Sequence, residues 1–198
     1  HIDWKGWARL GIPIVKEFFD SSLARQAVVL DTGLPAGASR ACFEVAVSAA
    51  ASFVAPIPGG TGGAGGAPEL VFIGAEPHAI AATGGLGAAD GVLECLACVE
   101  PDAAFAPRAL GDALAVRANE LSTCVCVLLA WDAPRRELVE MLCRAGVQVL
   151  VLVAQDDPAA VRLHPGPLAH HPERLRVLPA ADPGPALATL GAVRGAAA

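Results

Sequence analysis

Ser122-Thr-Cys-Val-Cys-Val-Leu-Leu-Ala130 is an apolar run without polar alternation, and Trp131-Asp132-Ala-Pro134 follows it directly. Such a run is typical of a strand that is buried on both faces of a parallel sheet. Asp132 can cap the next helix and Pro134 can occupy its first turn. We expect that helix over residues 137–144, a stop at Gly146, and a second buried strand over residues 147–153.

The same alternation of strand and helix extends in both directions along the chain. Parallel strands need long crossover connections, which helices usually supply, so the pattern predicts an α/β fold. We expect a doubly wound, mostly parallel sheet with helices on both faces and one antiparallel edge strand over residues 79–81. The other expected strands span residues 26–30 and 70–73, and helices are expected over residues 39–54, 84–100 and 108–118.

Domain organisation follows from composition. We expect residues 1–22 to form an N-terminal arm that packs on the domain and residues 23–155 to form the core. Residues 156–198 are rich in proline, which favours an irregular segment that wraps around the core. Within it, a short strand over residues 175–178 and a last helix over residues 186–193 are expected.

Charge and hydropathy exclude several functions. The chain of 198 residues has a net charge of −6, and its only lysines are Lys5 and Lys16, so no basic stripe could neutralise a nucleic acid. Although 54% of the residues are hydrophobic, no apolar stretch reaches the roughly 20 residues that a membrane span requires. Six cysteines, mostly within apolar runs, favour buried thiols in a reducing compartment, and we expect a cytoplasmic location.

Three segments near the N-terminus carry a resemblance to a known family. They are His1-Ile-Asp-Trp-Lys-Gly-Trp-Ala-Arg9, Pro13-Ile-Val-Lys-Glu-Phe-Phe19 and Gln26-Ala-Val-Val-Leu-Asp31. Their order resembles the bacterial family called domain of unknown function fifty-eight, which is grouped with von Willebrand factor A-like domains. The resemblance implies a von Willebrand A-like fold and a MoxR-type AAA+ ATPase as the partner. It also implies that membrane-spanning helices precede this segment in a longer protein that is anchored in the membrane.

Two expected strands end in an acid, Asp31 and Asp132, and ligands of open α/β sheets bind at such strand ends. In the von Willebrand A fold these positions, with a threonine that Thr83 could represent, hold a divalent cation. The family pattern Asp-x-Ser-x-Ser is replaced here by Asp31-Thr-Gly33-Leu-Pro35, which removes two hydroxyl ligands. Asp31, Thr83 and Asp132 remain candidates for a hydrated Mg²⁺, but we expect no metal and no cofactor. Both acids can instead cap the helices that follow them.

Cysteines occur in two close pairs. Cys95 and Cys98 have the spacing of half a zinc site, and Cys124 and Cys126 could supply the other half. The second pair shares one face of a strand, while the first pair belongs to a helix that packs on the sheet. We therefore expect four buried thiols and no zinc.

The function expected from these features is a non-enzymatic protein-binding or adaptor module that works with the ATPase in assembly or activation of a client complex. The alternative is a small hydrolase or transferase that uses Asp31, Asp132 and Thr83. Partner contacts are expected at the strand ends or at the N-terminal arm, whose tryptophans could equally anchor the arm to its own domain. The candidate contact residues are Asp31, Thr32, Thr83, Asp132, Arg135, Arg136, Trp4 and Trp7.

Overall fold

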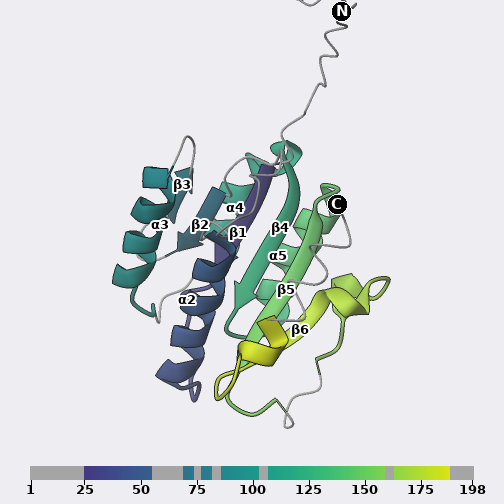
Figure 1. Ribbon diagram of the computed structural model, residues 1–198. Coiled ribbons are helices and arrows are strands. Elements are labelled where there is room, and N and C mark those ends of the chain that lie inside the picture. The colour runs from purple at the N-terminus through teal and green to yellow at the C-terminus, as the bar shows by residue number, and fades with distance from the viewer. Residues whose placement is uncertain are drawn as a thin grey trace, which may run out of the picture.

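A computed structural model describes residues 25–54, 69–73, 77–81, 86–102, 107–158 and 163–187 of the chain. Strands and helices alternate along most of this length (Figure 1). The strands are β1 (Arg25–Leu30), β2 (Glu69–Ile73), β3 (Pro77–Ala81), β4 (Leu121–Leu128), β5 (Gln148–Gln155) and β6 (Leu175–Pro179). The helices are α2 (Arg40–Val54), α3 (Leu86–Cys98), α4 (Pro107–Ala115) and α5 (Ala133–Arg144), with short 3-10 turns η1 (Ala118–Glu120), η2 (Gly166–Leu168) and η3 (Pro172–Arg174).

The strands form one sheet in the order β3-β2-β1-β4-β5-β6. In this order, every neighbouring pair of strands runs parallel except the first, because β3 runs antiparallel to β2. The parallel sheet with its crossover helices confirms the predicted α/β class. The order reverses between β1 and β4, and the crevice beyond the carboxyl ends of such strands is the usual ligand position in folds of this kind.

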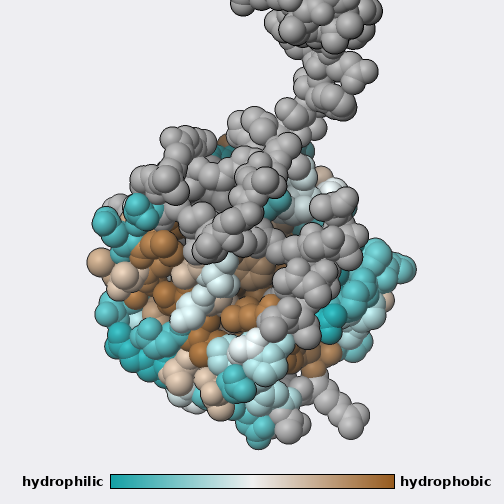
Figure 2. Space-filling view, viewed as in Figure 1, coloured by the Kyte–Doolittle hydropathy of each residue, from teal (hydrophilic) through white to brown (hydrophobic). Residues whose placement is uncertain are grey.

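Each face of the sheet is covered by helices, so the strands are apolar on both sides. Val28 and Leu30 of β1 belong to the layer beneath α2 and α3, whereas Ala27 and Val29 belong to the layer beneath α4 and α5. The two helix pairs lie on opposite sides of the sheet (Figure 1). On the face that carries α2 and α3, hydrophobic residues collect across the middle and hydrophilic residues surround them (Figure 2).

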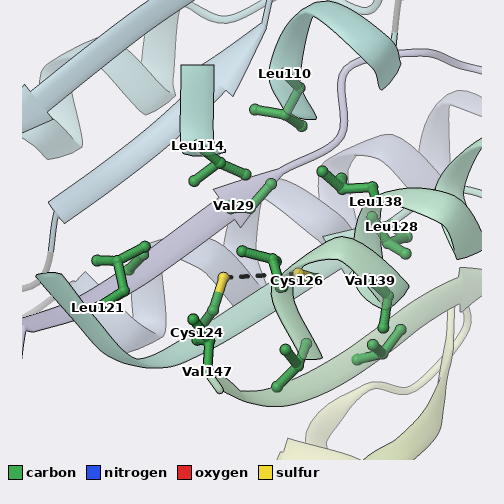
Figure 3. Packing of buried hydrophobic residues seen from close by; sticks show 14 of the residues in the cluster. Val29, Leu110, Leu114, Leu121, Cys124, Cys126, Leu128, Leu138, Val139 and Val147 are labelled. Carbon is green, nitrogen blue, oxygen red and sulfur yellow. Dashed lines mark hydrogen bonds between the residues drawn. The ribbon is translucent and has the colours of Figure 1, made fainter. Parts of the chain in front are cut away.

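The cysteine pairs fall in different layers. Cys124 and Cys126 of β4 are buried beneath α4 and α5, with their sulfur atoms 3.7 Å apart (Figure 3). Cys95 packs partly buried in the opposite layer, and Cys98 is exposed. The expectation that all four thiols are buried is therefore wrong for Cys98, which lies at the end of α3. The sheet separates the two pairs, so they cannot share one zinc ion.

The helix ends follow the predicted capping chemistry. The Asp132 side chain accepts a hydrogen bond from the Arg135 N–H at 3.1 Å, and a proline stands in the first turn of α5. With this cap, α5 begins at Ala133, four residues before the predicted start. Gly146, at φ +82°, follows the helix and turns the chain into β5.

The C-terminal segment contributes to the sheet. β6 pairs with β5, which confirms the predicted short strand. Residues 184–187 are helical, and Ala186 and Leu187 pack on the layer beneath α2. The rest of the predicted last helix lies outside the described residues, as does the N-terminal arm. Within the described part of the chain, no helix has the length and hydropathy to cross a membrane.

Candidate functional site

A buried carboxylate lies where β1 and β4 end. The Asp31 N–H donates to the Val127 carbonyl at 2.9 Å, which extends the pairing of the two strands by one residue. The Asp31 side chain is fully buried and accepts hydrogen bonds from the N–H groups of Gly33 at 2.8 Å and Leu129 at 2.9 Å. This carboxylate therefore joins the loops that follow both central strands.

Arg135, in the first turn of α5, supplies the opposite charge. Its Nε donates to Asp31 Oδ2 at 2.5 Å, and its Nη2 donates to Asp31 Oδ1 at 3.2 Å. Nη2 also donates to the Gly33 carbonyl at 2.7 Å, while Nη1 donates to Asp132 Oδ2 at 2.5 Å. The planar guanidinium thus lies between the two acids that were expected to mark the site.

Electrostatics favour direct contact between the Arg135 guanidinium and the carboxylates of Asp31 and Asp132. Arginine stays charged in proteins, and Arg135 is only 5% exposed, so it needs an anion close by. Burial raises the pKa of the Asp31 carboxyl, and the hydrogen bond and positive charge of Arg135 oppose that rise. The Asp132 side chain is 45% exposed and forms the solvent-facing side of the cluster.

This geometry corrects two expectations. Asp31 does not cap the next helix, because Ser39 precedes α2 and its Oγ accepts from the Cys42 N–H at 3.3 Å. Arg135, which was expected to contact a partner, is instead buried and bonded to both acids. The cap predicted at Asp132 is confirmed.

Of the other predicted contact residues, the structure describes Thr32 and Arg136. Thr32 is fully buried, its carbonyl accepts from the Asp102 N–H at 2.7 Å, and its hydroxyl has no hydrogen-bond partner among the described residues. Arg136 is partly buried and lines a cleft next to the cluster. Thr83, Trp4 and Trp7 lie outside the described residues.

The acids do not fit a divalent cation in this arrangement. Both Asp31 oxygens already accept hydrogen bonds from a backbone N–H and from Arg135. A cation between Asp31 and Asp132 would have to displace the guanidinium, which would then be buried without its anions. Elsewhere in the described ranges, no group of three or more His, Cys, Asp or Glu residues is arranged to hold a metal ion.

A cleft of about 550 Å³ opens at the carboxyl ends of β4 and β5 and at the loop after β1. Its volume is in the range of ligand pockets. The side chains that matter for its chemistry are Trp131, Arg136, Gln155, Asp156, Asp157 and His164. Of these six, sequence reasoning predicted only Arg136 as a site residue, although Asp156 and Asp157 follow a strand just as Asp31 does.

One wall of the cleft is joined to a helix start. Asp156 Oδ2 accepts from the Ser39 N–H at 2.9 Å, and Oδ1 accepts from the Ser39 hydroxyl at 2.5 Å. These hydrogen bonds hold the pKa of Asp156 below its ordinary range. The carboxylate thus occupies the N-terminus of α2, where a phosphate could otherwise bind.

In this arrangement Asp31 has no solvent access, so it cannot attack a substrate or take a proton from one. The neighbouring anion position, at the start of α2, is occupied by Asp156.

We compared the chain with known proteins. No protein-family model matches it, and no curated protein matches it.

Proposed function

We propose that this chain is a non-enzymatic, von Willebrand A-like adaptor that works with a MoxR-type AAA+ ATPase in assembly or activation of a client complex, on the cytoplasmic side. The observation that carries this proposal is the position of Arg135 between Asp31 and Asp132. The Arg135 guanidinium pairs with both acids at the strand ends, so partner binding there would not need a metal ion.

The architecture and the sequence both support the proposal. The strand order, with its antiparallel edge strand, suits a von Willebrand A-like domain with a degenerate metal site. The N-terminal motifs that end at Asp31 resemble the same family, and the ATPase partner is inferred from that resemblance alone.

The partner surface is proposed at the carboxyl edge of the sheet. Asp132 and Asp157 are exposed there, and Arg136 replaces the buried Arg135 as the accessible cation. Charged groups of this kind set the orientation and association rate of a complex more than its affinity. The alternative hydrolase or transferase gains no support, because both oxygens of the Asp31 carboxylate already accept hydrogen bonds from Arg135.

The test is capture of the cognate AAA+ ATPase by immobilised protein. The edge variant is Asp132→Ala/Arg136→Glu, and the matched control is Arg144→Glu at the other end of α5, where the side chain is exposed. An arm variant, Trp4→Ala/Trp7→Ala, examines the N-terminal segment. Circular dichroism shows whether each variant is folded.

We expect the edge variant to lose capture while the control and the arm variant retain it. Loss in the arm variant alone would move the contact to the tryptophans and refute the edge assignment. If the folded wild type does not capture the ATPase at all, the proposed partner is wrong.

A further inference from the structure

The face of the sheet beneath α2 is incompletely covered near the start of β5. Both connections that flank β5 lie on the opposite face: α5 precedes the strand, and Leu163 and Leu168 of the segment after it belong to the layer beneath α4 and α5. On the α2 side, Leu150 of β5 and its neighbour Val125 of β4 are only partly buried. These two residues, called here the β4–β5 strip, belong to the face viewed in Figure 2.

The β4–β5 strip has a polar limit toward the amino ends of the strands. Thr123 and Gln148 pair with each other two residues before the strip, so their side chains lie on the same face. Gln148 is exposed. The next residues on this face toward the carboxyl ends, Val127 and Leu152, are fully buried. An element that covers the strip therefore needs apolar side chains only between this buried centre and the polar limit.

The C-terminal segment returns to this face. β6 ends beside the last residue of β5, so the chain leaves the sheet at its carboxyl edge. Residues 184–187 are helical, and Ala186 and Leu187 pack on the layer that contains the strip. The first helical turn of the C-terminal segment is thus already seated on the incompletely covered face.

The sequence that follows continues the apolar pattern of this turn. Leu187, Leu190 and Val193 recur at intervals of three residues, which places them on one face of a helix. A helix over residues 184–193 would be about 15 Å long. The part of β5 from Leu150 to its end spans about 17 Å. The segment therefore has both the length and the apolar side chains to reach the strip.

We propose that residues 188–193 continue this helix and dock on the β4–β5 strip, with Leu190 and Val193 over Leu150 and Val125. Removal of apolar surface from water favours this contact. Because the segment is tethered to the same face by Leu187, docking is intramolecular and needs no second molecule. The strip then completes the core, and this role is separate from the partner surface proposed at the carboxyl edge.

The experiment is NMR of the full chain with ¹³C-labelled Leu and Val methyl groups. We expect nuclear Overhauser effects between the methyl groups of Leu190 or Val193 and those of Leu150 or Val125. A sample that mixes labelled and unlabelled chains separates contacts within one molecule from contacts between two. Absence of these effects in the folded protein would overturn the proposal. Effects only between molecules would also overturn it, because a second copy would then cover the strip.

A pair of variants tests the same contact independently. Leu190→Asp places a charge on the docking face, and Ala188→Asp places the same charge on the opposite face of the helix. We expect Leu190→Asp to raise the fluorescence of a dye that binds exposed apolar surface by about twofold or more. Ala188→Asp should resemble the wild type, and circular dichroism shows that both remain folded. An equal rise in both variants would contradict the assigned helix face.

Discussion

At the scale of the residue, Arg135 decides the character of the strand ends. A buried ion pair contributes little net stability compared with an apolar pair, but loss of one partner leaves an uncompensated charge. Asp31 and Arg135 are both buried, and they share the Gly33 backbone as a further partner. The pair should therefore behave as a unit on substitution.

We expect Asp31→Asn and Arg135→Met each to lower the free energy of unfolding by about 3–5 kcal/mol. The double variant should lose less than the sum, with a coupling of about 0.5–3 kcal/mol in urea unfolding. Arg144→Met, which breaks an exposed pair with Glu140, should cost less than about 1 kcal/mol. Simple additivity in the double variant would show that the two groups act independently.

The contact between Ser39 and Asp156 gives a prediction for acid conditions. Hydrogen bonds from Ser39 lower the pKa of Asp156 in the folded state. An acid with a lowered folded pKa adds stability above its unfolded pKa and loses that contribution as the pH falls. In Ser39→Ala, the Asp156 carboxyl should titrate at higher pH in ¹³C NMR, with the stability difference from wild type shrinking below about pH 4. An unchanged Asp156 titration would contradict the hydrogen-bond assignment.

At the scale of the element, capping and glycine geometry set where the helices begin and end. Asp132 starts α5, and Gly146 follows its end with a positive φ. Gly91, within α3, has the ordinary backbone of a helix, and apart from its chain neighbours and the backbone of its own helix no atom lies within 4 Å of the position that a Cβ would take there. The same holds for the space around Gly146. The two glycines therefore differ in backbone conformation and not in available space.

Gly146→Ala should lower the free energy of unfolding by about 1 kcal/mol, because an L-residue is strained at positive φ. Gly91→Ala should raise it by about 0.5–1 kcal/mol through helix propensity. Thermal or urea unfolding of both variants measures the difference. Equal effects of the same sign would refute the role of Gly146 as a conformational stop.

At the scale of the whole molecule, the sequence predicts layers better than it predicts contacts between them. The apolar runs at β1, β4 and β5 predicted the parallel sheet, and Asp132-Ala-Pro134 predicted the start of a helix. The Asp31–Arg135 pair joins residues 104 positions apart, so periodicity and capping rules could not reveal it. The contact between Ser39 and Asp156 spans 117 positions and was missed for the same reason.

Layer position also predicts how the thiols react. The hydrogen bond with Cys124 and burial both raise the pKa of Cys126 well above its ordinary value. Cys98 is exposed at the end of α3. A thiol reagent should therefore label Cys98 quickly in the native protein and label Cys124 and Cys126 only after denaturation, as peptide mass analysis would show. Fast native labelling of Cys126 would contradict the packing of β4 beneath α4 and α5.

The most direct test of the account is the response of the thermal midpoint to Mg²⁺ or Mn²⁺. Because Arg135 already bonds to both Asp31 and Asp132, millimolar metal should leave the midpoint of the wild type unchanged. A ligand at 100 times its dissociation constant would stabilise the native state by about 2.7 kcal/mol. A clear rise in the midpoint that Asp31→Ala abolishes would show that the strand ends bind a metal ion, and would contradict the role assigned to Arg135.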